Sequence, residues 1–316
     1  MSFQTIVQQE YEHPVIILKD EATGTYAEVY AFGAILNKFS AHHQNGELNV
    51  IDGFENVEQA MHTITPMFNS AKLSPFVCRI KNEKYHFGES SHRLSKYRMG
   101  NHAIHGLIYD AVFSVVDTHA DENGACVKLQ HVYDRDDEGF PYAYRCEVEY
   151  KLEKLNQLTI VTTVTNVDDQ LVPVADGWHP YFTLGNTIDE YQLEFQSKEV
   201  LEFDEELIPT GKVIPYQEFG SLKTIMDTSF DHCFTMNFAE CQPLCVIRNP
   251  LNKIQVEIYP SNEYPYLQIF TPGHRKSIAI ENLSAAPDAL NNGLGLKVLE
   301  QHESAIFITK FVIRPL

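Results

Sequence analysis

Two short segments of the sequence carry the residues best suited to acid/base chemistry. The first, Asp176-Gly-Trp-His-Pro-Tyr-Phe182, places His179 inside an aromatic segment that proline stiffens. The second, Ile280-Glu-Asn-Leu-Ser-Ala-Ala-Pro-Asp-Ala-Leu290, places Glu281 at the end of an apolar run. A histidine can titrate near working pH, and a carboxyl group beside it can exchange protons with a substrate. Brought together on a rigid sheet, the two residues would form a proton-transfer pair.

Three other residues have side chains suited to holding a ligand. Arg79 lies inside the apolar run Ser74-Pro-Phe-Val-Cys-Arg-Ile80, so its charge needs a structural carboxylate or a ligand oxygen. His105 precedes Gly106 in a loop, where a glycine allows close approach of a ligand or of the backbone. Asp231, in Ser229-Phe-Asp-His-Cys-Phe234, can accept hydroxyl groups of a ligand or cap a turn. Spacing along the chain does not show whether these side chains converge.

Structural roles compete with these functional ones. Glu281 could be a surface residue at the end of an edge strand, and His179 could be a core histidine bonded to a backbone carbonyl. His102, close to His105, is a weaker candidate for the site.

Several function classes lack their motifs. The sequence contains no nucleophile elbow, no phosphate-binding loop, no dinucleotide fingerprint, no HExxH and no nucleophilic cysteine motif. Cys241 and Cys245 lie near His232 but form no CxxC pair, so we expect no metal site there and no cofactor. The formal charge of -19 argues against nucleic acid and anionic membranes as partners.

The chain start and the cysteines indicate a compartment. The first ten residues have no basic start followed by an apolar segment, so no signal peptide is predicted. No stretch is apolar enough over 18 residues to predict a membrane span. The 6 cysteines are scattered through a large chain, which is typical of reduced thiols. We expect a cytoplasmic protein, as a monomer or a homodimer.

The hydrophobic pattern predicts an all-β protein. Apolar residues alternate with charged ones from Tyr144 to Leu152, and β-branched residues dominate Leu158–Thr165, with a hairpin turn at 154–157 between them. Helical signal is confined to Val57–Met61 and a stretch after Asn282. We predict one large antiparallel β-sandwich spanning residues 1–316 as a single domain. Further strands are predicted at 15–18, 26–32, 111–116, 126–133, 191–195, 254–259, 266–270 and 305–313, with turns at 122–124, 209–211 and 271–273.

The ordered set of motifs resembles the aldose 1-epimerase family, also called galactose mutarotases. The resemblance runs from about Val29 to Leu316 and rests on seven blocks in order. These are the segment around Arg79, Asn101–Gly106, Asp134–Pro141, Trp178–Phe182, Leu207–Gly211, Phe230–Phe234 and Ile280–Asn291.

The resemblance implies a fold and a role for each candidate residue. The fold is a large antiparallel β-supersandwich. Glu281 would be the general base and His179 the general acid of an isomerase that interconverts the anomers of a free sugar. Arg79, His105 and Asp231 would bind this small-molecule substrate, and no cofactor or metal is implied.

The sequence departs from the family pattern at several positions. Trp178 and Pro180 replace small polar neighbours of the acid histidine, and Leu107 stands where a second glycine is common. The segment Asn282-Leu-Ser284 replaces a polar pair that contains glutamine. We expect these positions to lie near the site and to change the sugar that it accepts.

Three alternative functions stay open at this point. A hexose 6-phosphate mutarotase would need a basic cluster at the cleft mouth, for which Arg275 and Lys276 are candidates. A non-catalytic carbohydrate-binding protein would keep the cleft but has no need of an acid/base pair. A glycoside-processing domain would need a second catalytic carboxylate.

Overall fold

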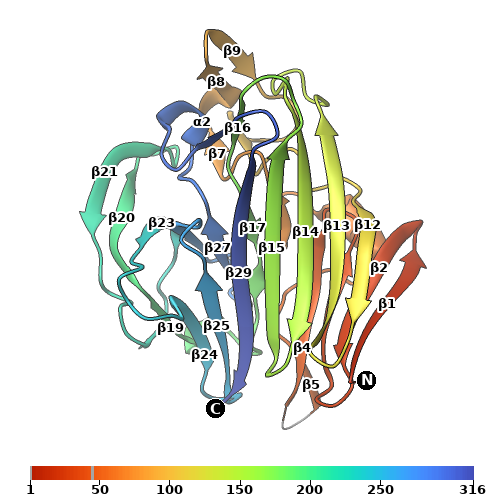
Figure 1. The fold of residues 1–316 in the computed structure, drawn as a ribbon. Coiled ribbons are helices and arrows are strands. Elements are labelled where there is room, and N and C mark those ends of the chain that lie inside the picture. The colour runs from red at the N-terminus through yellow and green to blue at the C-terminus, as the bar shows by residue number, and fades with distance from the viewer. Residues whose placement is uncertain (1, 44–45) are drawn as a thin grey trace.

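Antiparallel strands make up most of the chain, and the all-β prediction is confirmed (Figure 1). The computed structural model describes residues 2–43 and 46–316. The helical elements are short: α1 (Val57–Thr63), α2 (Ala289–Asn292), η1 (Lys81–Glu83) and η2 (Ile188–Glu190). In this described part of the chain, neither α-helix combines the length and the apolar character needed to cross a membrane.

The largest sheet has nine strands in the order β12-β13-β14-β15-β29-β25-β24-β19-β22. Its strands are β12 (Ser114–Ala120), β13 (Gly124–Asp134), β14 (Ala143–Glu153), β15 (Gln157–Asn166), β29 (Ser304–Pro315), β25 (Ile254–Pro260), β24 (Cys245–Asn249), β19 (Gln192–Phe195) and β22 (Lys223–Thr224).

The second sheet has eight strands and carries most of the candidate site. Its order is β21-β20-β23-β26-β27-β17-β6, with β18 also paired to β27. Its strands are β21 (Pro209–Pro215), β20 (Ser197–Phe203), β23 (Asp231–Met236), β26 (Tyr266–Phe270), β27 (Ile278–Leu283), β17 (Gly177–His179), β6 (Ala71–Leu73) and β18 (Tyr181–Phe182).

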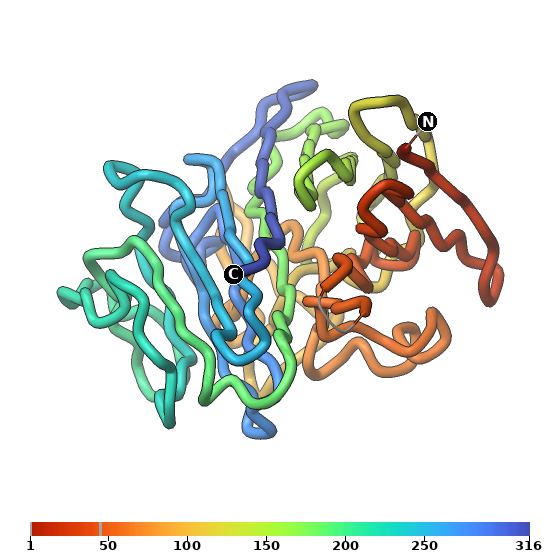
Figure 2. The backbone as a smooth tube through the Cα atoms, turned by 90° about the horizontal axis from the view of Figure 1, so that it is seen from below, coloured from red at the N-terminus to blue at the C-terminus, as the bar shows by residue number. Residues whose placement is uncertain are grey.

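Smaller sheets complete the fold. A five-stranded meander contains β1 (Phe3–Glu10), β2 (His13–Asp20), β3 (Thr25–Tyr30), β4 (Ile35–His43) and β5 (Gly46–Asn49). The other strands are β10 (Arg98–Met99), β11 (His102–Ile104) and β7 (Arg79–Ile80) in one sheet, β16 (Val172–Val174) with β28 (Lys297–Leu299), and β8 (Lys84–Phe87) with β9 (Ser90–Arg93). The β1–β2 hairpin and the β20–β21 hairpin lie at opposite sides of the molecule (Figures 1 and 2).

The main core lies between the nine-stranded sheet and the strands that face it. Along β14 the residues from Tyr144 to Leu152 alternate between buried and half-buried, as the pattern predicts. Tyr150 of this strand packs edge-on against Trp178 of β17, with ring centroids 6.0 Å apart. Phe311 of β29 packs in the same way against Phe182 of β18, at 5.3 Å. Aromatic contacts of this kind bring the two large sheets together.

Two of the predicted segments differ from the structure. The strand predicted at 111–116 begins at Ser114 instead, because Phe113 is fully buried and its amide donates to the carbonyl of Ala31. The turn predicted at 209–211 is wrong, since these residues belong to β21. The turn precedes them: Leu207 has a φ of 60°, and the Asp204 carboxylate accepts hydrogen bonds from two backbone amides there.

A buried ion pair supports the strand that carries His179. Lys72 of β6 lies opposite Trp178 and is fully buried. Its Nζ is 2.5 Å from Oδ2 of Asp176 and donates to the carbonyl of Gly177 at 3.0 Å. Oδ1 of Asp176 accepts from the hydroxyl of Tyr264 at 2.7 Å. A buried charge is tolerated when it is paired and hydrogen-bonded in this way.

Removing only one member of this ion pair should destabilise the fold strongly. Lys72→Met leaves the Asp176 carboxylate buried and unpaired, which costs about 3–5 kcal/mol. Urea unfolding monitored by circular dichroism measures the change. Lys19→Met, which breaks an exposed pair with Glu21, is the control and should change stability far less. A Lys72→Met protein as stable as Lys19→Met would contradict this account of β17.

Candidate active site

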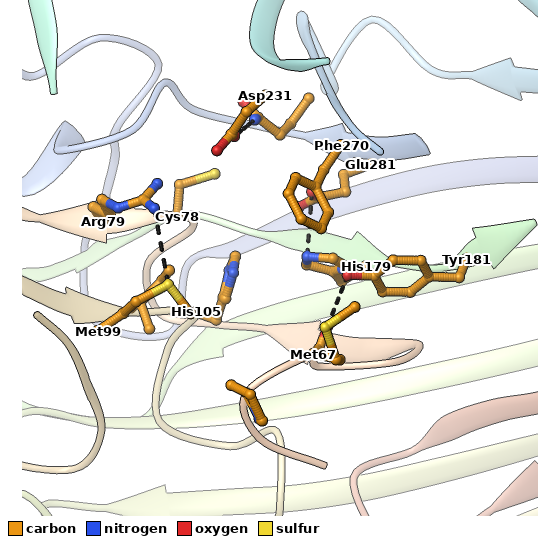
Figure 3. A pocket seen from close by; sticks show the side chains of 13 residues that line it. Met67, Cys78, Arg79, Met99, His105, His179, Tyr181, Asp231, Phe270 and Glu281 are labelled. Carbon is orange, nitrogen blue, oxygen red and sulfur yellow. Dashed lines mark hydrogen bonds and ion pairs between the residues drawn. The ribbon is translucent and has the colours of Figure 1, made fainter. Parts of the chain in front are cut away.

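All five residues predicted for the site line one cavity of about 230 Å³. Glu281, His179 and Asp231 come from β27, β17 and β23 of the eight-stranded sheet. Arg79 comes from β7, and His105 directly follows β11. Figure 3 shows these side chains directed toward a common space. Residues separated by up to about two hundred positions therefore meet at one place, which spacing along the chain could not show.

His179 and Glu281 face each other across neighbouring strands. Gly177 pairs with Leu283, and Tyr181 with Ala279, so the same register places His179 opposite Glu281. Nε2 of the histidine lies 3.3 Å from Oε1 of the glutamate (Figure 3). Both side chains are buried, with exposed fractions of 4% and 1%. The predicted pair is thus in direct contact and shielded from bulk water.

The backbone around His105 explains why a glycine follows it. His105 has a φ of 63° and its amide donates to the carbonyl of Cys78. Gly106 also has a positive φ, and a Cβ there would lie 2.4 Å from the carbonyl oxygen of Ser74. Only glycine fits this approach of two backbone segments. In this turn the His105 ring packs against the Phe68 ring. The centroids of the His105 and His179 rings are 4.9 Å apart.

Arg79 is the cation of the cavity. In the described residues no carboxylate forms a salt bridge with it, and its Nη2 contacts Sδ of Met99 at 3.8 Å. Of the two explanations given for this arginine, a structural carboxylate partner is therefore not found. Its guanidinium donors remain directed to the cavity, where a ligand oxygen can accept from them (Figure 3).

Asp231 is held by a glutamine that the sequence did not single out. Nε2 of Gln268 donates to Oδ1 of Asp231 at 3.0 Å. Gln268 lies opposite Glu281 in the β26–β27 ladder, and it also lines the cavity. Its Oε1 is buried without a hydrogen-bond partner among the described residues, so it offers one more acceptor to a ligand.

Other cavity residues were also missed by sequence reasoning. Tyr181 stacks on His179 and donates its hydroxyl to the carbonyl of Met67. Its position two residues after His179, on the same face of an extended segment, is a signal that could have found it. Cys78, Met99 and Phe270 line the cavity too, but nothing in their local sequence distinguishes them from core residues. His102 plays a different part, since its Nδ1 accepts from the amide of Asn82.

The departures from the family pattern do not line the cavity. Trp178 points into the core between the sheets, where the Lys72 ammonium lies 4.4 Å from its ring centroid. Leu107 is buried in the same core. The Asn282 amide donates to Thr309, and the Ser284 hydroxyl accepts from the amide of Asp176. These positions are sequence neighbours of His105, His179 and Glu281, but their side chains have structural partners and do not line the cavity.

Burial shifts the pKa values of Glu281 and His179 in the directions that favour their neutral forms. Desolvation raises the pKa of Glu281 well above its ordinary value, and the Asp231 charge raises it further, while Arg79 opposes both. Desolvation lowers the pKa of His179 to about 4, and it lowers the pKa of His105 well below its ordinary value. Both shifts disfavour the state with an ionised glutamate and a protonated histidine, so a single proton on the pair favours the carboxyl group.

The cavity also brings together groups that can bind a metal ion. One ligand atom each from His105, His179 and Glu281 lies within 4.8 Å of the others. Cys241 and Cys245, considered with His232 from the sequence, are not part of this group. Within the described residues all the cysteines are free thiols, and Cys78 is the one that lines the cavity.

The basic residues considered for a phosphate lie outside the cavity. Arg275 forms an ion pair with Asp189 and donates to the carbonyls of Met226 and Thr228. The Arg275 guanidinium thus has structural partners within the protein. Neither Arg275 nor Lys276 lines the cavity. The basic cluster that a 6-phosphate would require is not formed by these two residues.

Comparison with known proteins agrees with this geometry. The family description "Aldose 1-epimerase" matches residues 14–311, and the chain belongs to this family. It is 26% identical over 235 residues to the uncharacterized protein YihR of Escherichia coli K12, covering 72% of this chain and 73% of that protein. It is 27% identical over 199 residues to an aldose 1-epimerase of Streptococcus thermophilus, and the match covers 53% of this chain and 56% of that protein. A galactose mutarotase-like protein of Clostridium acetobutylicum shares the fold, with a TM-score of 0.88 and 17% sequence identity. The superposition covers 100% of this chain and 99% of that one.

The raised pKa of Glu281 leads to a prediction about stability. Folded Glu281 keeps its proton above 4.5, whereas the unfolded residue loses it, so wild-type stability falls as pH rises from there toward the folded pKa. Glu281→Gln removes this loss. Its melting temperature should exceed that of the wild type by about 2 °C or more at about pH 8, with the gain shrinking toward about pH 4. Calorimetry of both proteins across this range measures it. A variant less stable at every pH would contradict a protonated Glu281.

Proposed function

We propose that this member of the aldose 1-epimerase family interconverts the α and β anomers of a free aldose. One observation carries the proposal: a buried histidine and a buried glutamate face each other at 3.3 Å in a cavity that also holds an arginine without a carboxylate partner. The pair can move protons, and the arginine can bind a hydroxyl or ring oxygen. The aldose 1-epimerase of Streptococcus thermophilus, a relative by sequence, supports this assignment.

The reaction needs one proton on the pair and returns it unchanged. In the reactive form the Glu281 carboxylate accepts the proton of the anomeric hydroxyl, while protonated His179 donates to the ring oxygen. The C1–O5 bond breaks and the C1 carbonyl forms. After rotation about C1–C2 the carbonyl closes on its other face, O5 returns its proton to His179, and Glu281 reprotonates O1. No redox or group-transfer partner is required.

The proton must move from Glu281 to His179 before ring opening. The two groups are in contact at 3.3 Å, so this transfer needs no rearrangement of the backbone. Arg79 lowers the pKa of Glu281 and therefore favours the carboxylate. Sugar hydroxyls that donate to the carboxylate act in the same direction, since hydrogen bonds to the charged form stabilise it. Substrate binding thus promotes the reactive form.

The remaining polar side chains would orient the ring. Arg79, His105 and Asp231 offer donors and acceptors around the pair, and Gln268 fixes one oxygen of Asp231. Their role is positional, because holding the reacting groups in line lowers the entropic barrier. Tyr181 and Phe270 give the cavity apolar walls for the faces of the ring. We place the catalytic unit in a single domain of residues 1–316, in the cytoplasm.

The free sugar is favoured over a 6-phosphate as substrate. Arg79 is the cationic side chain that lines the cavity in the described structure, and Arg275 is committed to Asp189. A purely binding protein is disfavoured for another reason. Burying a histidine and a glutamate together shifts both pKa values toward the neutral forms, which is a cost that sugar binding alone does not explain.

Loss of either member of the pair should abolish most of the catalysis. Glu281→Gln and His179→Gln should each lower the rate of mutarotation at least about 100-fold, the usual worth of a general acid or base. Polarimetry of freshly dissolved α-D-glucose and α-D-galactose measures it after subtraction of the spontaneous rate.

A carboxylate outside the cavity provides the control. Glu257→Gln, on β25 of the nine-stranded sheet, removes a carboxylate paired with Arg314 and should retain wild-type activity. Wild-type protein that accelerates neither sugar would send the search to other aldoses. Unimpaired turnover by either Glu281→Gln or His179→Gln would refute the acid/base assignment.

The pH profile should lack an acid inflection at the ordinary value for histidine. A second proton inactivates the pair, and it binds to His179, whose pKa is lowered to about 4. On the acid side, kcat/KM should therefore fall only near about pH 4, since this parameter reports the free enzyme. A decline through an inflection near the unperturbed value of 6.5 would show that His179 titrates normally.

A further inference from the structure

We propose that His105, His179 and Glu281 form a binding site for a divalent transition-metal ion, with Zn²⁺ as the probe, and that the ion competes with the sugar. The cluster contains two imidazoles and one carboxylate, and one ligand atom of each lies within 4.8 Å of the other two. Two histidines with one glutamate are a known ligand set for zinc, which leaves a fourth position open for water or substrate.

The backbone holds the three ligands in place without the ion. Glu281 and His179 face each other on paired strands, and His105 is fixed by the turn that Gly106 allows. The two imidazole rings are nearly perpendicular, at 87°, with centroids 4.9 Å apart. Phe68 packs against one ring and Tyr181 against the other, which limits rotation of both. A site whose ligands are already immobilised loses little entropy when it binds an ion.

Each ligand has an atom that the protein leaves without a hydrogen-bond partner. Among the described residues these atoms are Nδ1 of His105, Nδ1 of His179 and Oε2 of Glu281. All three residues are more than nine-tenths buried, with exposed fractions of 7%, 4% and 1%. Buried polar atoms without partners are uncommon in folded proteins, and water or a sugar hydroxyl in the cavity can satisfy them. The metal ion would take the ligand atoms that converge, and for His179 the nitrogen that faces Glu281 is Nε2.

Binding of the ion would block catalysis. An imidazole and a carboxylate that donate lone pairs to a metal cannot move protons between O1 and the ring oxygen. Inhibition should therefore be competitive with the sugar. This second half rests on the proposed function, whereas binding of the ion does not.

Calorimetric titration of the purified, tag-free chain with zinc chloride tests the binding. One ion should bind per chain, and excess galactose should weaken its binding. His105→Asn and Glu281→Gln should each lower zinc affinity by more than about 10-fold. Substituting a residue that only hydrogen-bonds to a metal ligand already lowers affinity by about 10-fold or more, and these two variants remove a ligand itself. His119→Asn is the matched control, because it removes an exposed histidine beside Asp121 and should leave the affinity unchanged.

Cobalt absorption identifies the ligands in the unaltered protein. Co²⁺ bound by two histidines and a carboxylate gives visible bands without a thiolate charge-transfer band. A strong thiolate band would assign the ion to a cysteine such as Cys78 and overturn the proposed ligand set. Absence of zinc binding to the wild type, or equal binding by the control and the two site variants, would also overturn it.

The two proposals can fail separately. Zinc that binds stoichiometrically to a chain without mutarotase activity would support the metal site and refute the proposed function. Active protein that zinc neither binds nor inhibits would refute the metal site alone.

Discussion

The register between β17 and β27 is the constraint on which the site depends. Gly177 opposite Leu283 and Tyr181 opposite Ala279 leave His179 opposite Glu281. A slip of one residue would turn His179 toward the core and bring Trp178 to the cavity. The register is secured at one end, where the amide of Ser284 donates to the carbonyl of Asp176 and the amide of Asp176 donates to the Ser284 hydroxyl. The contact between His179 and Glu281 is thus a consequence of sheet geometry.

The same strand carries two titratable pairs on its two faces. On the cavity face His179 meets Glu281, and burial drives both toward their neutral forms. On the core side Lys72 meets Asp176, whose carboxyl group contacts the Lys72 ammonium and accepts from the Tyr264 hydroxyl. The pairs differ in what satisfies them. In the core pair, Lys72 and Asp176 contact each other, the Gly177 carbonyl and the Tyr264 hydroxyl, whereas Nδ1 of His179 and Oε2 of Glu281 have no hydrogen-bond partner among the described residues.

Much of the fold could be predicted from the sequence, and the segments that were predicted wrongly have physical explanations. Alternation along β14 predicted both its strand and its buried face, because one face of that sheet meets the core. The turn at 209–211 was mispredicted since Pro, Thr and Gly also fit an exposed edge strand, and the Asp204 carboxylate formed the turn before it. Local motifs singled out the five candidate residues that line the cavity. Gln268 was not, because only the β23–β26–β27 ladders place it between Asp231 and Glu281.

The departures from the family pattern show how far local sequence can mislead about a site. Trp178 is adjacent to His179 in the chain, yet neighbouring residues of a strand point to opposite faces. Its indole packs against Tyr150 and Lys72 in the core, so its size adjusts the contact between sheets. Pro180 lies with Trp178 beside a small apolar gap of about 10 Å³ between the sheets. The side chains that do line the cavity include Met67, Met99 and Phe270. Since these side chains lie at the same cavity as the contact between His179 and Glu281, a substitution at one of them would alter the shape of the cavity and leave that contact in place.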